Sequence, residues 1–209
     1  MWVSNAFRTD VLPISGDFNV YGGIHRPVHL LVTGKDCISP LFYGSSGVLI
    51  RQGKVTKELA ELTVETHLSA STITGKRVRV TMTDAEGRVV AQKESSVDGD
   101  VVYTPLSLRE GQGVSLWNGR KNPYLYTIKV ELLDGDIVVD CRTEQTGLRF
   151  FSVDAEKSFF LNGEPYPLRG FNRHEDVEGK GSAPALQADR PVTTDHLRHL
   201  RTSRTLPGL

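Results

Sequence analysis

Apolar and polar residues alternate with a period of two through the middle of the chain. Residues 62–68, 78–82 and 126–132 each place large apolar side chains on one face and charged or polar side chains on the other. Because successive side chains of a β-strand point to opposite faces, this pattern predicts strands with one buried face. The residues predicted to face the core are Leu62, Val64, Val80, Tyr126, Ile128 and Val130.

Turn residues recur between these segments at intervals of about ten positions. Asp84-Ala85-Glu86-Gly87 separates two predicted strands, and Asp134-Gly135 leads into Ile137-Val138-Val139 as a hairpin turn. No helical period of any length competes with the alternation. The pattern therefore predicts an antiparallel, immunoglobulin-like β-sandwich over about residues 54–153.

The residues before this sandwich have a different character. Val28, Leu30 and Val32 alternate with His29, Leu31 and Thr33, which predicts a strand near the end of an earlier β-domain. The following stretch, 35–51, is rich in Gly and Ser and contains Pro40. Its composition predicts a linker between the two domains.

A second hairpin is predicted after the sandwich. The apolar run 159–161 meets Asn162-Gly163, whose residues tolerate the positive φ of a type I′ turn, and another apolar run follows. The polar cluster Asn172-Arg173-His174-Glu175-Asp176 comes soon afterwards. A strand that ends in such a cluster can line a concave polar site, whereas the plain alternative is a solvated loop.

Composition excludes some classes of partner. The 209-residue chain has 25 basic and 25 acidic residues, and both nucleic acid and anionic membranes favour a basic excess. No apolar run approaches the roughly 18 residues that span a bilayer, and no signal peptide is visible, which leaves the localisation open. Cys37 and Cys141 have neither a metal nor a redox spacing and are predicted to be buried reduced thiols.

Some aromatic and histidine side chains could bind a ligand instead of serving only the fold. Trp117, Tyr124 and Tyr126 could form a sugar-stacking platform, but Tyr126 lies on the apolar phase of its strand, which favours packing. His67 lies on a polar strand face and is predicted to be a surface histidine. His196 and His199, three residues apart, could ligate a metal on a helix, but no cysteine lies near them.

Three ordered motifs resemble one family. Residues 159–176, with Leu161-Asn162-Gly163 and then Leu168-Arg169-Gly170-Phe171 running on into the polar cluster, are similar to the hairpin that opens the catalytic barrel of family 2 glycoside hydrolases. This family contains the β-galactosidases and β-glucuronidases. Asp17 to Val28 resembles the end of its sugar-binding domain, and Leu116-Trp117 with Pro123 to Tyr126 resembles late strands of its second domain.

The resemblance implies a mainly β fold divided into parts. Residues 1–40 would be the C-terminal part of a jelly-roll sugar-binding domain, and 41–153 the immunoglobulin-like sandwich. Residues 154–181 would begin a (β/α)8 barrel, whereas 182–209 depart from the family and are predicted to be a disordered tail, as a truncated or frame-shifted gene would produce.

The resemblance also implies a site. The counterparts of Asp17 and His174 contact the sugar, with Arg169, Asn172 and Arg173 shaping the floor of the pocket. From chemistry alone, Asp17 would instead be a turn residue after Ser15-Gly16. The resemblance implies a part of a β-galactosidase-like retaining hydrolase of O-glycosyl bonds. Two stretches, Phe7 to Gly16 and Phe42 to Ser45, resemble the β-galactosidase branch of the family more than its β-glucuronidase branch.

Catalytic residues are not expected in this chain. A retaining glycosidase uses two carboxyl groups about 5 Å apart, which the family carries as glutamates on later barrel strands. A barrel needs about 250 residues, and fewer than 60 follow residue 153. Glu175 and Asp176 are adjacent, so on a strand they would point to opposite faces. The chain alone is therefore expected to be inactive.

Cofactors and partners follow from the same resemblance. No cofactor is expected within this chain, although parent enzymes of the family use divalent or monovalent cations. The expected partner is a β-glycoside bound by a full-length enzyme, with no nucleic acid and no membrane; homo-oligomerisation of the parent stays open. The alternative function is a non-catalytic β-sandwich module for carbohydrate binding or adhesion. It is disfavoured because the chain begins inside one predicted domain and stops inside another.

Overall fold

The structure is a computed structural model that describes residues 28–109 and 114–170, with residues 4, 6, 9, 10, 23 and 24. The chain divides into two units, residues 31–169 and residues 1–30 with 170–209. The architecture below is that of residues 31–169. The sequence-based expectations for the domain before residue 28 and for the tail from Ser182 lie outside the described residues, and the predicted domain boundaries stay predictions.

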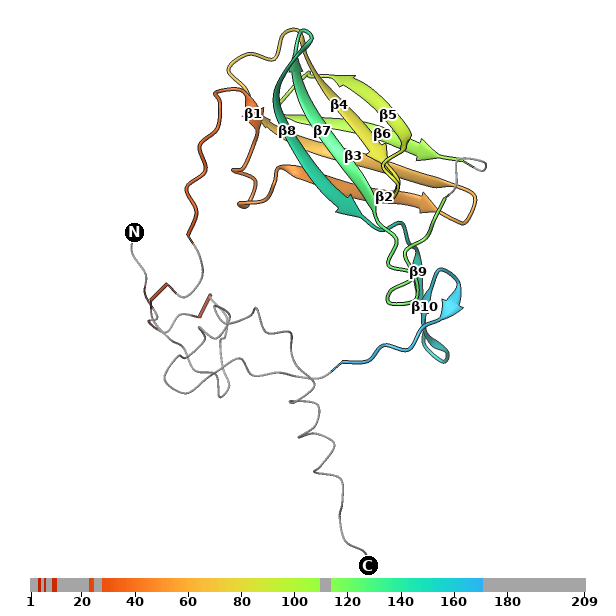
Figure 1. The fold of residues 1–209 in the computed structure, drawn as a ribbon. Coiled ribbons are helices and arrows are strands. Elements are labelled where there is room, and N and C mark those ends of the chain that lie inside the picture. Colours follow the sequence, from red (N-terminus) through yellow and green to blue (C-terminus); the bar gives the residue numbers. More distant parts are fainter. Residues whose placement is uncertain are drawn as a thin grey trace, which may run out of the picture. The chain divides into compact units, whose positions relative to one another are not determined.

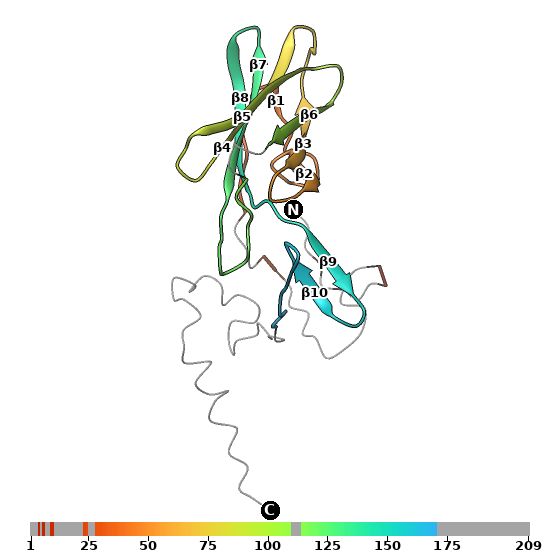
Figure 2. The same ribbon diagram turned by 90° about the vertical axis from the view of Figure 1, so that its right-hand side faces the viewer.

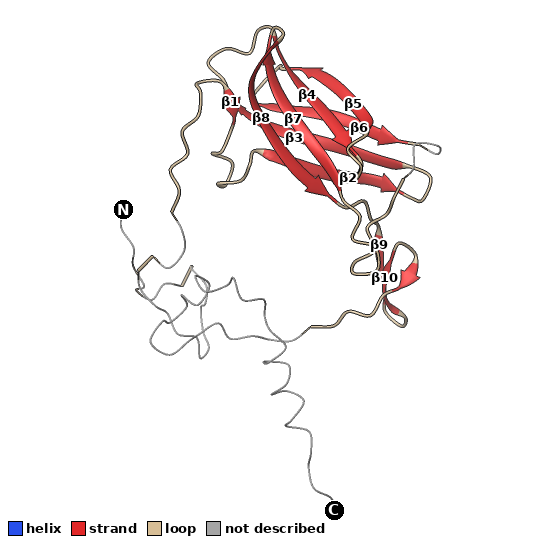
Figure 3. Ribbon diagram, viewed as in Figure 1, coloured by secondary structure: helices blue, strands red, loops and turns tan. Residues whose placement is uncertain are grey.

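The described residues form strands and turns and contain no helix (Figure 3). The strands are β1 (Cys37–Ile38), β2 (Val48–Val55), β3 (Ala60–Ser69), β4 (Lys76–Thr83), β5 (Val89–Ser96), β6 (Val101–Leu108), β7 (Tyr126–Asp134), β8 (Ile137–Thr146), β9 (Phe151–Asp154), β10 (Ser158–Leu161) and β11 (Glu164–Pro165). This part of the chain accordingly has no helix that could span a membrane.

Two antiparallel sheets lie face to face as a sandwich (Figures 1 and 2). In one sheet, β3 pairs with β1 and β2 along one edge and with β6 along the other. The second sheet has the order β5-β4-β7-β8, and a small separate sheet has the order β11-β10-β9. The mainly β, immunoglobulin-like fold class predicted from the sequence is confirmed.

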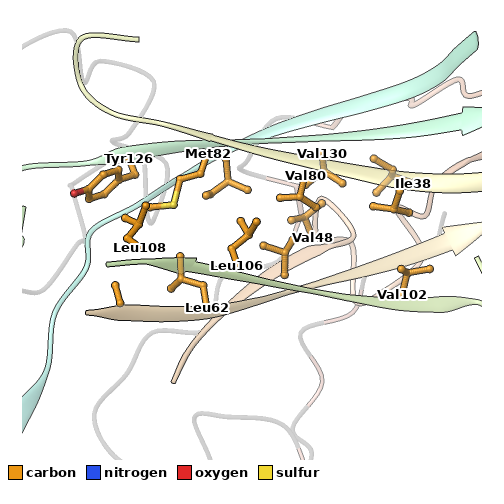
Figure 4. Close-up of a cluster of buried hydrophobic side chains, with 14 of the residues drawn as sticks. Ile38, Val48, Leu62, Val80, Met82, Val102, Leu106, Leu108, Tyr126 and Val130 are labelled. Atoms are coloured by element: carbon orange, nitrogen blue, oxygen red, sulfur yellow. The ribbon is translucent and has the colours of Figure 1, made fainter. Parts of the chain in front are cut away.

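The core lies between the two large sheets, where the alternating apolar residues meet (Figure 4). All six residues predicted to face the core are at most 3% exposed. Val78, Met82, Leu106 and Leu108 complete the layer from strands on both sides. The period of two places these side chains inward and leaves the intervening polar side chains on the outer faces, as expected for half-buried strands.

Strand β6 is one of the strands of the sandwich that the alternation argument did not single out. Its buried residues Val102, Thr104, Leu106 and Leu108 alternate with exposed residues that include Pro105. Proline lacks the N–H that an inner strand donates to a neighbour. It is tolerated here because β6 is an edge strand that pairs only with β3.

The prediction of a linker over residues 35–51 is wrong in part. Cys37–Ile38 pairs with the end of β3, and β2 begins at Val48, so only the segment between these strands is a loop. The Ile38 N–H donates to the Asp140 carboxylate at 2.9 Å. A contact across a hundred residues cannot be read from local composition, which is why a Gly- and Ser-rich stretch indicated only a flexible connection.

Asp36 fastens this segment to the sandwich. Its carboxylate accepts hydrogen bonds from the Ser71 N–H at 2.6 Å and from the Ser71 hydroxyl at 2.9 Å. It also pairs with Lys76 Nζ at 3.0 Å, and the same ammonium group contacts Asp134 at 2.7 Å. The Lys76 side chain is 1% exposed, so its charge depends on these two carboxylates for compensation.

These contacts shift the ionisation of both partners. The backbone hydrogen bond from Ser71 and the ammonium group of Lys76 lower the pKa of Asp36 from 3.8 to about 2. Hydrogen bonds to Asp134 and then to Asp36 raise the pKa of Lys76. Each shift favours the charged form, so the ion pairs persist well into the acid range.

The strand predicted over Val28 to Val32 is not present. These residues have no strand assignment, and Leu30 is 90% exposed and Val32 88% exposed. Alternation alone does not make a strand, because a strand needs a neighbour for its backbone groups. No described strand pairs with this segment.

His67 is not the free surface histidine predicted from its polar strand face. Its ring stacks on Phe42 with centroids 3.9 Å apart, and its Nε2 lies 2.8 Å from the Glu65 carboxylate. Glu65, 5% exposed, also accepts a hydrogen bond from Arg51 at 2.6 Å. Arg51 and then His67 lower the pKa of Glu65. The 40–46 loop covers this part of the outer face, which local sequence could not indicate.

Both cysteines are free thiols, as predicted, but only Cys37 is buried. Cys141 is exposed on β8, so the expectation of two buried thiols is wrong for this residue. Strand β8 is an edge strand of its sheet, and Cys141 falls on the polar phase of its alternation.

Replacing Ile128 by Ala should lower the free energy of unfolding by about 2–5 kcal/mol, because a fully buried Ile leaves a cavity. Ile137→Ala is the matched control. Ile137 is 71% exposed on the adjacent strand, so its replacement should cost less than about 0.5 kcal/mol. Urea denaturation followed by circular dichroism measures both values. Equal losses from the two variants would contradict the packing described above.

The Asp36 carboxylate has a lower pKa in the folded chain than its ordinary value of 3.8. It therefore stabilises the fold above about pH 4, and this contribution is lost as the pH falls through about 2. Asp36→Asn should lower stability at neutral pH and make stability less dependent on pH between 4 and 2. The exposed Asp100→Asn change is the control. Denaturation series at several pH values compare the three proteins, and a wild-type-like acid slope in Asp36→Asn would contradict this assignment.

Candidate functional site

Most of the residues predicted to contact a sugar fall outside the described residues. These are Asp17, Asn172, Arg173 and His174, and the same holds for Glu175 and Asp176. Arg169 is described: it is exposed and makes no hydrogen bond or ion pair within the described part of the chain. The five residues remain a predicted site, of which the structure places one.

The strands that lead to Arg169 form the small sheet. Strands β9 and β10 pair from Phe151↔Leu161 to Asp154↔Ser158, and β10 turns back into β11 through Asn162 and Gly163. Asn162 has φ 54° and Gly163 has φ 81°, as both central residues of a type I′ turn require. The Asn-Gly hairpin predicted from the sequence is confirmed.

One of the two residues at the tip of this hairpin, Asn162, is buried, whereas Gly163 is exposed. Asn162 is 8% exposed, and its backbone N–H donates to the Phe150 carbonyl at 2.8 Å. Its side chain accepts from the Phe150 N–H at 3.1 Å and donates to the Trp117 carbonyl at 2.9 Å. One carboxamide therefore joins the hairpin to the strand before it and to a loop of the sandwich 45 residues earlier.

Two glycines make room for this contact between the hairpin at Asn162 and the Trp117 loop of the sandwich, which is called the joint below. A Cβ at Gly119 would collide with the Tyr166 hydroxyl oxygen, and Gly119 has φ 56°. A Cβ at Gly147 would lie 2.7 Å from Cβ of Trp117, closer than real Cβ atoms approach. Both positions need glycine because the hairpin and the Trp117 loop pass close to their backbones.

Polar contacts extend the joint into the sandwich. The Gln52 side chain donates to the Gly147 carbonyl and accepts from the Arg149 N–H, each at 3.0 Å. The Arg149 guanidinium carbon lies 5.4 Å from the centre of the Trp117 ring, within cation–π range. Trp117 is thereby held between the sandwich and the hairpin, and its carbonyl is fixed for Asn162.

The aromatic residues act in packing and not as an exposed platform. Tyr126 is fully buried, and its hydroxyl accepts a hydrogen bond from the Ser115 N–H at 2.8 Å. Burial raises the pKa of Tyr126. Tyr124 packs edge-on against Tyr126 with ring centroids 5.1 Å apart. The packing interpretation of Trp117, Tyr124 and Tyr126 is supported over the sugar-stacking alternative.

A hollow of about 480 Å³ lies between β5 and β6, and its lining, 89–93 and 105–107, contains no carboxylate and no aromatic side chain. No group of three His, Cys, Asp or Glu residues within the described ranges could hold a metal ion. His196 and His199 lie outside those ranges.

Comparison with known proteins agrees with this geometry. Residues 48–149, nearly the whole sandwich, match the family model Glycosyl hydrolases family 2. A β-glucuronidase of Bacteroides fragilis is 37% identical over 188 residues, which cover 86% of this chain. The chain belongs to glycosyl hydrolase family 2. A β-galactosidase of Bacteroides ovatus is also similar, with 34% identity over 168 residues and 77% of this chain covered.

Solved structures of family 2 proteins share the fold. A crystal structure of a Bacteroides fragilis protein, provisionally described as a β-galactosidase, covers 88% of the chain with a TM-score of 0.80 and 35% identity. The crystal structure of a Bacteroides uniformis β-glucuronidase covers 95% with a TM-score of 0.76 and 27% identity. The chain covers 28% and 23% of these two proteins.

The chain spans about a quarter of the length of such relatives, with 26% for the B. fragilis enzyme and 19% for the B. ovatus enzyme. Relatives named for galactosides and for glucuronides match over similar extents. The region of family 2 that this chain represents therefore does not by itself distinguish the two sugars.

Sequence reasoning missed the residues that build the joint. Asn162 was recognised as a turn residue, but its side-chain bonds to Trp117 and Phe150 depend on docking that no local pattern reveals. Asn118-Gly119 is a second Asn-Gly turn signal that could have identified the loop. The requirement for glycine at 147 has no sequence signal, because it arises only from contact with Trp117.

Gly119→Ala should lower the free energy of unfolding by about 2–5 kcal/mol, since positive φ costs about 1–2 and overpacking about 1–3. In a Tyr166→Phe background the colliding hydroxyl is absent and only ring carbons at 3.0 Å and beyond remain, so the cost should fall by about 1 kcal/mol or more. Urea denaturation measured by Trp117 fluorescence, with Trp2 replaced by Phe, compares the four variants of this cycle. Additive effects would show that the hairpin does not pack on Gly119.

Proposed function

We propose that this chain is part of a family 2 enzyme that hydrolyses the O-glycosyl bond of a β-galactoside or β-glucuronide. Within that enzyme, the chain supplies a rigid sandwich and part of the sugar-contacting surface. The observation that carries the proposal is the hairpin anchored by Asn162, because it fixes the start of the segment that runs through Arg169 to the predicted residues Asn172, Arg173 and His174.

Arg169 has the chemistry of a sugar contact. Its guanidinium group offers five N–H donors in a fixed plane and has no partner within the described residues. Such a group can donate to sugar hydroxyls, or in paired fashion to the carboxylate of a glucuronide. Asp17 and His174 are proposed to add an acceptor and a further donor. Hydrogen bonds that strengthen as charge develops on the sugar would favour the transition state.

The catalytic pair is proposed to lie outside this chain. A retaining hydrolase needs one carboxylate as nucleophile and one carboxylic acid as proton donor, about 5 Å apart. A complete (β/α)8 barrel needs about 250 residues, which exceeds the 209 of this chain. Glu175 and Asp176 are the adjacent acidic residues of the predicted site, and neighbours on a strand diverge.

A non-catalytic carbohydrate-binding module has less support. Such modules use an exposed polar or aromatic surface, whereas the described aromatic residues of this sandwich near the hairpin serve packing. The hollow between β5 and β6 has no aromatic side chain that could stack on a sugar ring.

Weak sugar binding should depend on Arg169. Methyl β-galactoside and methyl β-glucuronide are titrated into the isotope-labelled chain, and chemical shifts are followed by NMR. Arg169→Ala should weaken binding about tenfold, as expected for one charge-assisted hydrogen bond. Lys57→Ala removes an exposed positive charge on the β2–β3 turn and should have no effect. Identical affinities of wild type and Arg169→Ala would remove Arg169 from the site.

The purified chain should not hydrolyse chromogenic β-galactosides or β-glucuronides, because two converging carboxylates are required for nucleophilic attack and leaving-group protonation. The assay compares the wild-type chain with Glu175→Gln and with buffer. Turnover above buffer that disappears in Glu175→Gln would show that the chain carries its own catalytic carboxylate.

A further inference from the structure

The chain contains two Asn-Gly pairs, Asn118-Gly119 and Asn162-Gly163, and both lie at the joint between sandwich and hairpin. Asparagine is among the thermolabile residues of proteins. Its side chain is most reactive before glycine, because no side chain shields the next backbone nitrogen. The two pairs therefore offer the same chemistry in two different structural settings.

The reaction is spontaneous deamidation, and it needs only water. The backbone nitrogen of the glycine attacks the carboxamide carbon of asparagine, loses its proton and expels ammonia, which leaves a five-membered succinimide. Water then opens either carbonyl of this ring. The products are aspartate or isoaspartate, so a neutral amide becomes a negatively charged carboxylate with no oxidant or cofactor involved.

Asn162 is held away from this reaction. Its carboxamide oxygen accepts from the Phe150 N–H at 3.1 Å, and its amide nitrogen donates to the Trp117 carbonyl at 2.9 Å. Its backbone N–H is bound to the Phe150 carbonyl at 2.8 Å. Cyclisation would move the carboxamide onto the Gly163 nitrogen and break both side-chain bonds in a site that is 8% exposed.

Asn118 of the other Asn-Gly pair serves as a comparison for Asn162 within the same chain. Its backbone N–H donates to the Asn122 carbonyl at 2.7 Å, but its side chain makes no hydrogen bond to a described residue. It is half-buried in the loop next to Trp117. Nothing in the described structure therefore restrains its carboxamide as Asn162 is restrained.

A carboxylate could not replace the Asn162 carboxamide. Asparagine donates to one group and accepts from another, whereas an ionised carboxylate only accepts. The oxygen in place of the amide nitrogen would face the Trp117 carbonyl, so two acceptors would meet in a buried site. A buried acceptor without a donor, and a buried charge above all, destabilises the docked arrangement.

We propose that Asn162 is a carboxamide latch that locks the hairpin to the sandwich, and that Asn162-Gly163 is a latent deamidation site protected only while the latch is closed. Deamidation would open the latch permanently and release the strand that leads to Arg169. The chemistry and the contacts involved are independent of the proposed glycosidase function.

Peptide mapping by mass spectrometry tests the protection. The folded wild-type chain is incubated at mildly alkaline pH and 37 °C, and deamidation is followed separately at the two asparagines. Asn162 should react at least about tenfold more slowly than in denaturant, because two hydrogen bonds must break first. Asn118 should be slowed less. Equal rates for Asn162 in the folded and denatured chain would overturn the proposal.

Hydrogen exchange tests the latch with the matched pair Asn162→Asp and Asn118→Asp. Asn162→Asp should speed exchange of the Phe150 amide by at least about tenfold while amides of β3 and β7 keep their protection. Asn162→Gly, which keeps the turn but lacks the carboxamide, should do the same, and Asn118→Asp should not. Unchanged Phe150 exchange in Asn162→Asp, or loss of protection throughout β7, would overturn a local latch.

Discussion

Burial of one face of each sheet against the other is the interaction on which the rest of this structure depends. Val64, Val80, Ile128 and Val130 are fully buried, and a side chain of this size contributes about 1.5–3 kcal/mol when it leaves water. Because the core fixes the strands, it also fixes the loops at their ends. The contacts of Asp36, Trp117 and Asn162 are secondary in this sense: they attach further segments to a framework that already exists.

A series of contacts connects this core to the hairpin that precedes Arg169. Tyr126 is part of the core, and its hydroxyl binds the Ser115 N–H at the start of the loop that carries Trp117. The Trp117 carbonyl accepts from Asn162, and the hairpin then continues to Arg169. Hairpin turns usually face solvent, whereas here Asn162 is buried and only Gly163 stays exposed. The backbone N–H of Asn162 and both polar groups of its side chain have partners, which restrains this end of the hairpin.

The polar residues of the sandwich are largely engaged in holding it together. Glu65 is paired with Arg51 and His67, and Lys76 is paired with Asp36 and Asp134. Arg169 has no such partner among the described residues. This division fits a structural domain of a glycosyl hydrolase family 2 protein.

The period-two alternation by itself determined the fold class and the inward faces of β3, β4 and β7, and the Asn-Gly pair determined the turn at 162–163, because these depend on neighbours along the chain. Motif resemblance added the family and the proposed sugar contacts. Only the tertiary structure decided that Cys37–Ile38 is a strand, that His67 is covered by Phe42, and that Asn162 is buried against Trp117. Each of these features depends on a contact between residues at least 25 positions apart in the sequence, such as Phe42 with His67 or Trp117 with Asn162. Local sequence patterns indicate which side chains of a strand are buried, but they do not indicate which distant segment of the chain covers them.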